Sequence, residues 1–590
     1  MGHEDVRVVI AHGADGTGGY LFQRPETVLT AIRPAEVMPV LREVQSATDN
    51  GMCAAGFLTY EAGSGLDAAM RTHSTDDLSI PLAWFGIFRG ADEIRIPDDD
   101  DGAGFRAGTW QPSMSAGQHA DAVGRIKEYL RSGDTYQVNH TFRLRTSFEG
   151  EPWSLFCRIQ RNQMARYATF IETDRFAVCS ASPELFFSLD GDTLISKPMK
   201  GTSRRGLTAW QDKELTSRLQ SSAKERAENV MIVDMVRNDM GRIAERGTVE
   251  VSQMFEVERY PTVLQMISTV TCKTSVNLPE IMKALFPCAS ITGAPKIRTM
   301  QIIRELEPGP RGIYTGCAGY ILPGRHARFN VAIRTVVVDK RAGTAEYGVG
   351  AGIVWDSDAG KEYQECLVKS AVLTAQRPRF DLMETILWDG EDGYFLLDEH
   401  MERLACSAAY FGFLIDLRKI RQSLVEHGEE MGSATHKVRL LASEKGGIVV
   451  QTERLAATVF GRPWLVALTE EPVEPDNPYL YHKTTNRLIY DRARKSRPGR
   501  DDVLLVNTLG EVTESTIANV VIETNGKYLT PPVRCGLLAG VFRNWLIGRG
   551  EIVEQTLTAD DILNCDKLFL INSVRKWIPA ELDGGSLGYE

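Results

Sequence analysis

The chain has 590 residues, of which 43% are hydrophobic and 25% are charged. This composition is typical of globular protein and excludes a disordered or collagen-like chain. The length suits about two to four domains. The formal net charge of −11 at pH 7 gives no electrostatic reason to expect a nucleic-acid partner.

No apolar run approaches the roughly 18 residues of a membrane-spanning helix. The first residues lack the basic and then apolar pattern of a signal peptide. The ten cysteines include no C-x-x-C pair, which argues against a zinc site or a disulfide scaffold. We therefore expect a reduced, cytoplasmic protein with no membrane and no nucleic-acid partner.

Strand and helix patterns mix along the first two thirds of the chain. Residues 1–115 form a lead-in part with strand patterns at 54–62 and 82–90, and the acidic stretch over 98–104 is typical of a solvated loop. Residues 116–376 form the core of this first domain. Its expected helices cover 118–134, 221–245 and 359–376, and its expected strands include 140–148, 175–189 and 327–339.

The pattern restarts at Arg377-Pro378-Arg379, and we place the domain boundary near residue 378. A strand, a turn, a strand and a helix are expected over 380–404, and more strands and helices follow to the end of a second domain, 380–590. The whole chain therefore belongs to the α+β class.

Two helix patterns in the first domain carry paired carboxylates. Glu225 and Glu228 are three residues apart, as are Glu362 and Glu365, and Lys369 follows Glu365 by four residues. Each set shares one helix face. Mg²⁺ prefers oxygen ligands and takes one or two protein carboxylates beside substrate and water, so these pairs fit a magnesium site. Solvated helix faces are the alternative that spacing leaves open.

Three further fragments could carry chemistry. Glu184 stands beside a proline in an apolar strand pattern, where burial would raise its pKa and let it donate a proton. Lys200 precedes a Gly-Thr turn, and a desolvated lysine is a nucleophile. Gly293 precedes a helix pattern, where free N–H groups can seat an anion. Each fragment alone is equally compatible with an ordinary turn.

Taken in order, the motifs of the first domain resemble the chorismate-utilising enzymes, which include anthranilate, aminodeoxychorismate, isochorismate and salicylate synthases. The resemblance runs from about residue 116 to 374. It is carried by GDTYQVNHTFRL, SASPELF, KPMKGT, AENVMIVDMVRNDMGR, ITGAPK, RGIYTGCAGY, FNVAIRT and GVGAGIVWDSD followed by EYQECLVKS. It implies one large α+β domain of two layered antiparallel sheets, with outer helices and a buried site between the sheets.

The resemblance also assigns roles to residues. Glu228 and Glu365 look like Mg²⁺ ligands, with Glu225 and Glu362 as neighbours, and Glu184 looks like the acid that protonates the departing C4 hydroxyl of chorismate. The remaining positions are expected to contact substrate: Gln137, Thr202, Tyr314, Arg334, Gly350, Gly352 and Lys369.

Two positions sort the subfamilies, and a third departs from the family pattern. Isochorismate and salicylate synthases carry a lysine base where this chain has Gln137, so the resemblance favours an ammonia user. Lys200 stands where anthranilate synthases have alanine, and it resembles the lysine of aminodeoxychorismate synthases. That lysine attacks C2 and displaces the C4 hydroxyl, after which ammonia attacks C4 and expels the lysine from C2. Gln265 departs from the histidine common in relatives.

The second domain resembles the fold-type IV pyridoxal-phosphate enzymes, which include transaminases and aminodeoxychorismate lyase. The carrying segments are DEHMERLACSA, LYHKTTNRLIYD and GEVTESTIANVVIETNGKYLTPPVRCGLLAGVFR. By this resemblance Lys483 forms the Schiff base with the cofactor, Glu514 pairs with the pyridinium nitrogen and Arg403 anchors the phosphate. Ile517 and Val541 are expected to supply N–H donors to the phosphate, and Asn572 and Arg575 to line the substrate side. These residues do not separate a lyase from a transaminase.

The two resemblances together predict a chain that converts chorismate and ammonia to 4-amino-4-deoxychorismate and then eliminates pyruvate to leave 4-aminobenzoate. Mg²⁺ and pyridoxal 5′-phosphate are the expected cofactors. No glutaminase motif is visible, so a separate glutamine amidotransferase subunit is the expected source of ammonia, and a homodimer through the second domain is a further expectation. Two alternatives stay open: an anthranilate-type chorismate aminase fused to a transaminase, and a regulatory or scaffold protein with one inactive half.

Overall fold

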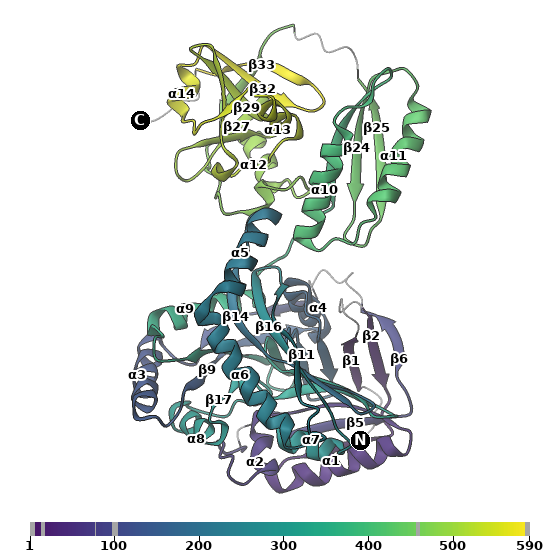
Figure 1. Cartoon of the computed structure of the whole chain (residues 1–590), viewed down its shortest axis with the longest axis vertical. Coiled ribbons are helices and arrows are strands. Elements are labelled where there is room, and N and C mark those ends of the chain that lie inside the picture. The colour runs from purple at the N-terminus through teal and green to yellow at the C-terminus, as the bar shows by residue number, and fades with distance from the viewer. Residues whose placement is uncertain (1–5, 13–17, 77, 97–103, 456–460, 585–590) are drawn as a thin grey trace. The chain divides into compact units, whose positions relative to one another are not determined.

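The computed structural model describes residues 6–12, 18–76, 78–96, 104–455 and 461–584. Most of the acidic stretch over 98–104, expected as a loop, lies outside the described residues. By its contacts the chain divides into two units (Figure 1). The first unit comprises 1–204 and 216–377, and the second comprises 205–215 and 378–590. None of the helices in the described ranges is long and apolar enough to cross a membrane.

Two large sheets, antiparallel throughout, form the first unit. Within the described residues the first sheet has eleven strands, in the order β17-β9-β21-β20-β11-β10-β1-β2-β6, with β7 and β8 also paired to β9. Their bounds are β1 Arg7–His12, β2 Gly18–Gln23, β6 Asp92–Arg95, β7 Phe105–Ala107, β8 Gln111–Pro112, β9 Gln137–Gly150, β10 Thr169–Glu172, β11 Phe176–Ser180, β17 Gly293–Ala294, β20 Thr335–Asp339 and β21 Thr344–Ile353.

The second sheet has ten strands in the described part of the chain, in the order β14-β16-β13-β12-β19-β18-β4-β5-β3, with β15 also paired to β16. Their bounds are β3 Thr27–Ala31, β4 Cys53–Leu58, β5 Ala83–Phe88, β12 Leu185–Asp190, β13 Thr193–Lys197, β14 Met199–Arg204, β15 Glu250–Arg259, β16 Val263–Lys273, β18 Cys317–Leu322 and β19 His326–Val331. Strands from the lead-in part, 1–115, thus extend both sheets.

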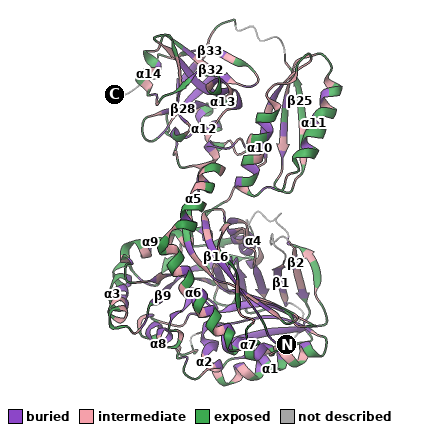
Figure 2. Ribbon diagram, viewed as in Figure 1, coloured by how far each residue is buried: buried purple, intermediate pink, exposed green. Residues whose placement is uncertain are grey.

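Helices cover the sheets of the first unit and expose their outward faces (Figure 2). They are α1 Pro34–Asp49, α2 Gly63–Leu66, α3 Ala116–Ser132, α4 Pro152–Gln163, α6 Ala223–Gly241, α7 Leu278–Leu285, α8 Lys296–Leu306 and α9 Ala359–Ser370. Ser115 caps α3 and Gly133 ends it in the left-handed conformation with φ of 79°, which is the expected pattern of helix start and stop. Helix α5, Ala209–Ser221, begins in the segment 205–215, which belongs to the second unit.

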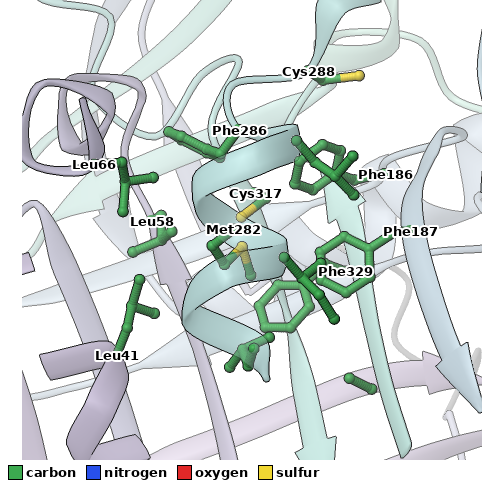
Figure 3. Close-up of a cluster of buried hydrophobic side chains, with 14 of the residues drawn as sticks. Leu41, Leu58, Leu66, Phe186, Phe187, Met282, Phe286, Cys288, Cys317 and Phe329 are labelled. Atoms are coloured by element: carbon green, nitrogen blue, oxygen red, sulfur yellow. The ribbon is translucent and has the colours of Figure 1, made fainter. Parts of the chain in front are cut away.

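One of the hydrophobic clusters of the first unit centres on α7. Its side chains pack with those of α1 and of the second sheet, including Leu41, Phe186, Phe286 and Phe329 (Figure 3). The Phe187 and Phe329 rings stack at 5.3 Å between centroids. Burying several aromatic side chains in this way contributes much of the hydrophobic stabilisation and fixes the distance between helix and sheet.

The expected strand over 175–189 is wrong in one respect, because the structure breaks it into two. Strand β11 belongs to the first sheet and β12 to the second, and the chain crosses between the sheets over 181–184. A second crossing occurs over 332–334, between β19 and β20. Both crossings bring chain segments into the space between the layers, where a site can be enclosed.

The second unit contains two sheets of its own. Among the described residues, a four-stranded antiparallel sheet has the order β23-β22-β24-β25 and is covered by helices α10 and α11. The other sheet is mixed and has eight strands in the described part of the chain, in the order β28-β27-β26-β33-β32-β29-β30-β31. The strand bounds are β22 Leu382–Asp389, β23 Gly393–Tyr394, β24 His436–Ala442, β25 Ile448–Arg454, β26 Trp464–Leu468, β27 Asp502–Val506, β28 Val512–Ser515, β29 Asn519–Thr524, β30 Lys527–Thr530, β31 Val553–Glu554, β32 Lys567–Asn572 and β33 Lys576–Leu582. The helices are α10 Leu397–Phe411, α11 Leu417–Met431, α12 Leu488–Ser496, α13 Val541–Gly548 and α14 Ala559–Leu563.

The segment 205–215 is built into the second unit by specific contacts. Arg205 pairs with Asp212 at 2.6 Å and donates a hydrogen bond to the carbonyl oxygen of Tyr410 at 2.8 Å. Leu207 packs into a hydrophobic cluster of the second unit, and its carbonyl oxygen lies 3.1 Å from Nε2 of His482. A segment that lies within the first domain in the sequence therefore contacts His482, the residue directly before Lys483.

Candidate active sites

A cavity of about 300 Å³ lies in the first unit and collects nearly all of its predicted site residues. The lining includes Glu184, Lys200, Thr202, Glu225, Glu228, Tyr314, Arg334, Gly350, Gly352, Glu362, Glu365 and Lys369. Segments from both sheets and from helices α6 and α9 supply them. Because α6 packs on β14 and α9 packs on β21, the helices bring their carboxylates to the same cavity as the strand residues.

Lys200 lies at the meeting point of the two sheets. A Cβ added to Gly352 on β21 would lie 2.9 Å from Nζ of Lys200 and 3.2 Å from Nε2 of Gln137 on β9. A larger residue at position 352 would have to displace the lysine amine from the β21 backbone. Burial lowers the pKa of Lys200 from its usual value, and the neighbouring Lys369 lowers it further, against the opposing effects of Glu228 and Glu184. The amine is therefore easier to deprotonate than a surface lysine.

Gln137, a predicted substrate contact, lies close to Gly352 but is not among the residues that line the cavity. Its amide is fully buried, and neither Nε2 nor Oε1 has a hydrogen-bond partner among the described residues. Burying such a group without a partner is costly. The amide is thus available to a substrate or to the Lys200 amine.

Glu184 occupies the first crossing between the sheets and is buried. The hydroxyl of Ser290 donates to Oε1 of Glu184 at 2.7 Å. Burial raises the pKa of Glu184 to about 7, although Ser290 and Lys200 act in the opposite direction. At neutral pH a large share of this carboxyl is protonated, as a proton donor requires.

The four carboxylates on α6 and α9 face one another. The pKa of Glu225 is raised by burial and then by the like charge of Glu228, and Glu365 on the other helix acts in the same direction. Burial likewise raises the pKa of Glu362. This mutual repulsion fits a site for a cation. No group of three acidic, histidine or cysteine side chains in the described part of the chain is close enough to hold a metal alone, so a magnesium ion here would need oxygen atoms of substrate or water as well.

The residues expected to contact the substrate differ in the hydrogen bonds and ion pairs that they already form within the protein. Lys369 forms an ion pair with Glu365 at 2.6 Å and donates to the carbonyl oxygen of Gly350 at 3.0 Å. Arg334 sits at the second crossing with φ of 53° and donates to the carbonyl oxygen of Lys369. A positive φ is strained for arginine, and strain of this kind gathers at functional sites. The ring of Tyr314 lies against Gly348. A Cβ added to Gly348 would lie 2.1 Å from Cγ of Tyr314, so a side chain there would displace the ring.

Two further residues position this site: Gln265, which the sequence marked as a departure from relatives, and Asn229, which was missed in the sequence. Asn229 donates from Nδ2 to the carbonyl oxygen of Lys200 at 3.3 Å and accepts from Ser268 at 2.6 Å. Gln265 holds the turn after Lys200, because its Oε1 accepts from Thr202 at 3.0 Å and its Nε2 donates to the carbonyl oxygen of Gly201 at 2.9 Å. The adjacency of Asn229 to Glu228 was the available signal.

The anion seat expected at Gly293 does not form. Gly293 lies in strand β17, paired with Val138 of β9, and a Cβ there would lie 2.1 Å from the carbonyl oxygen of Gln137. The glycine is needed for this close approach, with φ of 136°. Its role is to bring the backbone of α8 against β9 behind the cavity.

A second cavity, of about 240 Å³, lies within the second unit. Its lining includes each predicted cofactor residue: Arg403, Lys483, Glu514, Ile517 and Val541. The pKa of Lys483 is lowered to about 8, mainly by burial and then by Arg403. An amine with such a pKa has a substantial neutral fraction near pH 7.5 and can form an imine.

Glu514 lies at the bottom of this cavity on β28 and is buried. Tyr490 donates its hydroxyl to Oε1 at 2.8 Å, and Nδ2 of Asn519 lies 3.4 Å from Oε2. Burial raises the pKa of Glu514 to about 7. A cationic ring nitrogen placed beside it would offset that desolvation and favour the carboxylate.

Arg403 is held at the opposite side by a carboxylate. Its Nε donates to Oε1 of Glu384 at 2.9 Å and its Nη2 contacts Oε2 at 2.5 Å, while His400 lies 2.7 Å from the same Oε2. Arg403 and His400 hold the pKa of Glu384 at about 2, against the effect of burial. Glu384 was missed in the sequence, where an acidic residue inside an apolar strand pattern was the signal.

The residues around Arg403 fit a phosphate group. Gly540 precedes α13, and a Cβ there would lie 2.0 Å from Oδ1 of Asn519. Val541 and Phe542, the first residues of α13, line the cavity together with Ile517. Backbone N–H groups at a helix start beside an arginine are suited to phosphate. Together with Lys483 and Glu514, this arrangement fits pyridoxal phosphate.

Comparisons with known proteins match the two units separately. Residues 8–375 match the family model for chorismate binding enzyme, and residues 381–582 match the model for amino-transferase class IV. These matches confirm the predicted α+β architecture, a chorismate-binding fold followed by a fold-type IV domain.

Named relatives match the first unit. Aminodeoxychorismate synthase component 1 of Klebsiella aerogenes is 40% identical over 262 residues, 44% of this chain and 58% of that protein. Anthranilate synthase component 1 1 of Haloarcula marismortui is 40% identical over 267 residues, 45% of this chain and 54% of that protein. The chain thus spans little more than half the length of these relatives. The crystal structure of anthranilate synthase component I from Streptococcus pneumoniae matches the fold with a TM-score of 0.54 at 24% identity, covering 62% of this chain and 92% of that one.

Proposed function

The chain belongs to the chorismate binding enzyme family, and we propose that it makes 4-amino-4-deoxychorismate from chorismate and ammonia and then releases pyruvate to leave 4-aminobenzoate. The observation that carries the first step is the placement of Lys200, whose amine lies beside Gly352 and Gln137 in the same cavity as Glu184. The similarity to aminodeoxychorismate synthase component 1 supports the same reaction.

In the first unit, Lys200 attacks C2 of chorismate through its neutral amine. The C4 hydroxyl leaves as water with the proton that Glu184 supplies, and both conjugated ring double bonds shift along the ring from C2 toward C4. Ammonia then attacks C4 and expels the Lys200 amine from C2, which returns both double bonds to their original positions. Two displacements by nucleophiles are easier than one direct substitution of a poor leaving group.

Magnesium would be held by Glu228 and Glu365, with Glu225 and Glu362 beside them. Bound there, Mg²⁺ would neutralise a carboxylate of the substrate, which four protein carboxylates would otherwise repel. Arg334 and Tyr314 line the same cavity and can hydrogen-bond a carboxylate. This set orients the ring toward Lys200.

In the second unit, Lys483 takes the proton from C4 of the aminated product. Pyridoxal phosphate, when bound, supplies the electron sink for that carbon. Glu514 would pair with the ring nitrogen of this cofactor, and Arg403 with the start of α13 would hold its phosphate. Loss of pyruvate from C3 makes the ring aromatic, which drives the reaction to 4-aminobenzoate.

Ammonia would come from a separate glutamine amidotransferase subunit. The relatives named component 1 support a partner of this kind, because the name implies a second component. We also propose that the second unit forms a homodimer, and the mass of the purified chain in solution tests this.

The decisive experiment supplies the purified chain with chorismate, Mg²⁺, an ammonium salt and pyridoxal phosphate, and identifies the products by mass. We expect 4-aminobenzoate and pyruvate in equal amounts. Aminodeoxychorismate without 4-aminobenzoate would refute the lyase step. Anthranilate would instead support the reaction named for the Haloarcula relative.

A further inference from the structure

A short segment of the first domain's sequence, residues 205–215, belongs by its contacts to the second unit. The residues on both sides of it, up to 204 and from 216, belong to the first unit. The segment begins directly after β14, the strand that carries Lys200. A linker between two domains is typically exposed and makes few contacts. The contacts that this segment makes within the second unit therefore indicate a role other than that of a linker.

A buried ion pair gives the segment a defined shape. Arg205 donates from Nε and Nη2 to Oδ2 of Asp212 at 2.9 and 2.6 Å, and the N–H of Gly206 donates to Oδ1 of Asp212 at 2.7 Å. Only 9% of the Arg205 side chain and 2% of the Asp212 side chain are exposed. An ion pair removed from water is costly unless its geometry is good and further hydrogen bonds support it. The supporting bonds found here hold the segment in one conformation.

The segment binds Tyr410 of α10. Nη2 of Arg205 donates to the carbonyl oxygen of Tyr410 at 2.8 Å, and the Tyr410 hydroxyl donates to the carbonyl oxygen of Gly206 at 2.8 Å. The Arg205 guanidinium also lies over the Tyr410 ring, 4.4 Å from its centre. The ring of His482 stacks on the same tyrosine, with 4.4 Å between the ring centres. Tyr410 therefore contacts both the segment and His482.

The same segment fixes the orientation of the His482 ring. Nε2 of His482 lies 3.1 Å from the carbonyl oxygen of Leu207, and Nδ1 lies 2.9 Å from the hydroxyl oxygen of Ser407. A carbonyl oxygen can only accept a hydrogen bond, so Nε2 carries the proton. Burial lowers the pKa of His482 to about 4, so the ring is neutral at pH 7 and Nδ1 accepts from Ser407. Leu207 and Ser407 together thus determine the tautomer and the direction of this ring.

His482 is joined directly to Lys483, the amine assigned to the cofactor. The carbonyl oxygen of Lys483 accepts from the N–H of Met383 on β22 at 2.9 Å. The backbone at Lys483 is thus held by β22 and, through His482, by Tyr410 and the segment 205–215. A catalytic amine needs such support, because a displacement of about 1 Å can cost a hundredfold in rate.

We propose that the segment 205–215 is part of the second active site, with Arg205 and Asp212 as positioning residues that act on Lys483 through His482. This proposal rests on the proposed function, in which Lys483 is the lysine that binds pyridoxal phosphate. Neither Arg205 nor Asp212 lines the cavity, so both act indirectly. Residues 380–590 contain every predicted cofactor residue, yet they form a complete site only together with this segment of the first domain's sequence.

The bound cofactor can report the position of Lys483 without turnover. Burial is the largest cause of the lowered pKa of Lys483, Arg403 and Arg487 lower it further, and Glu384 and Glu514 oppose them. A lysine released from its fixed position would gain contact with water, and its affinity for a proton would rise. The visible absorbance of bound pyridoxal phosphate changes when the nitrogen that it shares with the lysine takes up a proton. The pH midpoint of that change therefore measures how firmly Lys483 is held.

The experiment titrates this absorbance in the full chain loaded with pyridoxal phosphate, without chorismate or ammonium. D212N removes the charged partner of Arg205 at nearly constant shape, and H482F keeps an aromatic ring but loses both hydrogen bonds. We expect each variant to raise the midpoint by about one pH unit. D398N is the matched control, because it breaks an exposed Asp–Arg pair of the same unit and should leave the midpoint unchanged. An unchanged midpoint in D212N and H482F would overturn the proposal.

Two further variants separate positioning from a general loss of structure. H482Q keeps an N–H donor in place of Nε2, so its shift should be smaller than that of H482F. In the double variant D212N/H482F the shift should equal that of H482F alone, because Asp212 acts through His482. Additive shifts, or equal shifts in H482Q and H482F, would refute this route. These spectra do not depend on whether the chain forms 4-aminobenzoate, whereas a wild type that binds no pyridoxal phosphate would refute both this proposal and the proposed second step.

Discussion

The two cavities contain the same pair of groups in different electrostatic surroundings. Each has a lysine with a lowered pKa and a buried glutamate with a pKa of about 7. Four more carboxylates line the first cavity beside the cations Lys224, Arg334 and Lys369, whereas six more cations line the second. Under the proposed function, a magnesium ion would balance the carboxylates of the first cavity, and the cations of the second would bind a phosphate group. The same pair of groups can therefore be used in two different kinds of site.

The largest expected effect comes from removing the lysine of the second cavity. K483A should abolish both the visible absorbance of bound pyridoxal phosphate and the formation of 4-aminobenzoate, because no other lining amine is assigned to the cofactor. The first unit should continue to consume chorismate at the wild-type rate. Absorbance spectra and product masses check both. A variant that keeps the cofactor spectrum would contradict the role of Lys483.

The corresponding change in the first cavity should remove the first reaction and leave the second intact. K200A should lower aminodeoxychorismate formation by about a thousandfold or more, since the covalent route is lost. It should still convert added aminodeoxychorismate to 4-aminobenzoate. Single-turnover mass spectrometry of the wild type should also detect a covalent adduct on Lys200. If no adduct forms and the K200A variant is active, Lys200 is not the nucleophile.

A smaller effect is expected from the buried acid. E184Q should lower the rate of the first step by about a hundredfold, the usual contribution of a positioned acid. Because the pKa of Glu184 is about 7 and the protonated form is the active one, the wild-type rate should fall as pH rises through 7. The E184Q variant should lose this fall. An identical pH profile in wild type and E184Q would assign the proton to another group.

The smallest effect concerns the carboxylate that holds Arg403. E384Q should weaken binding of pyridoxal phosphate about tenfold, because the guanidinium loses its charged partner and its fixed orientation. Equilibrium dialysis of the cofactor measures the change. The control is D398N. Asp398 is an exposed residue in the first turn of α10, the helix that carries Arg403, and this variant should bind the cofactor normally. Equal affinity of E384Q and D398N would show that Glu384 does not position Arg403.

The sequence alone determined the class of the fold and the two families of motifs along the chain, and it predicted the candidate reactive residues. Local signals sufficed for helices such as α3, because a Ser-x-x-Gln start and a glycine end lie within the helix itself. The pairs Glu225 with Glu228 and Glu362 with Glu365 followed from helical spacing. Motifs of this kind are short, so neighbouring residues along the chain define them.

The tertiary structure alone decided which distant residues meet. No local pattern places Glu184 at a crossing between two sheets, aims Lys200 at Gly352 or pairs Glu384 with Arg403. The pKa values of these groups depend on burial and on charges from other elements, which chain neighbours do not reveal. Likewise, Leu207 contacts His482 across a sequence separation of 275 residues. Packing over long sequence separations, rather than local preference, therefore created both sites.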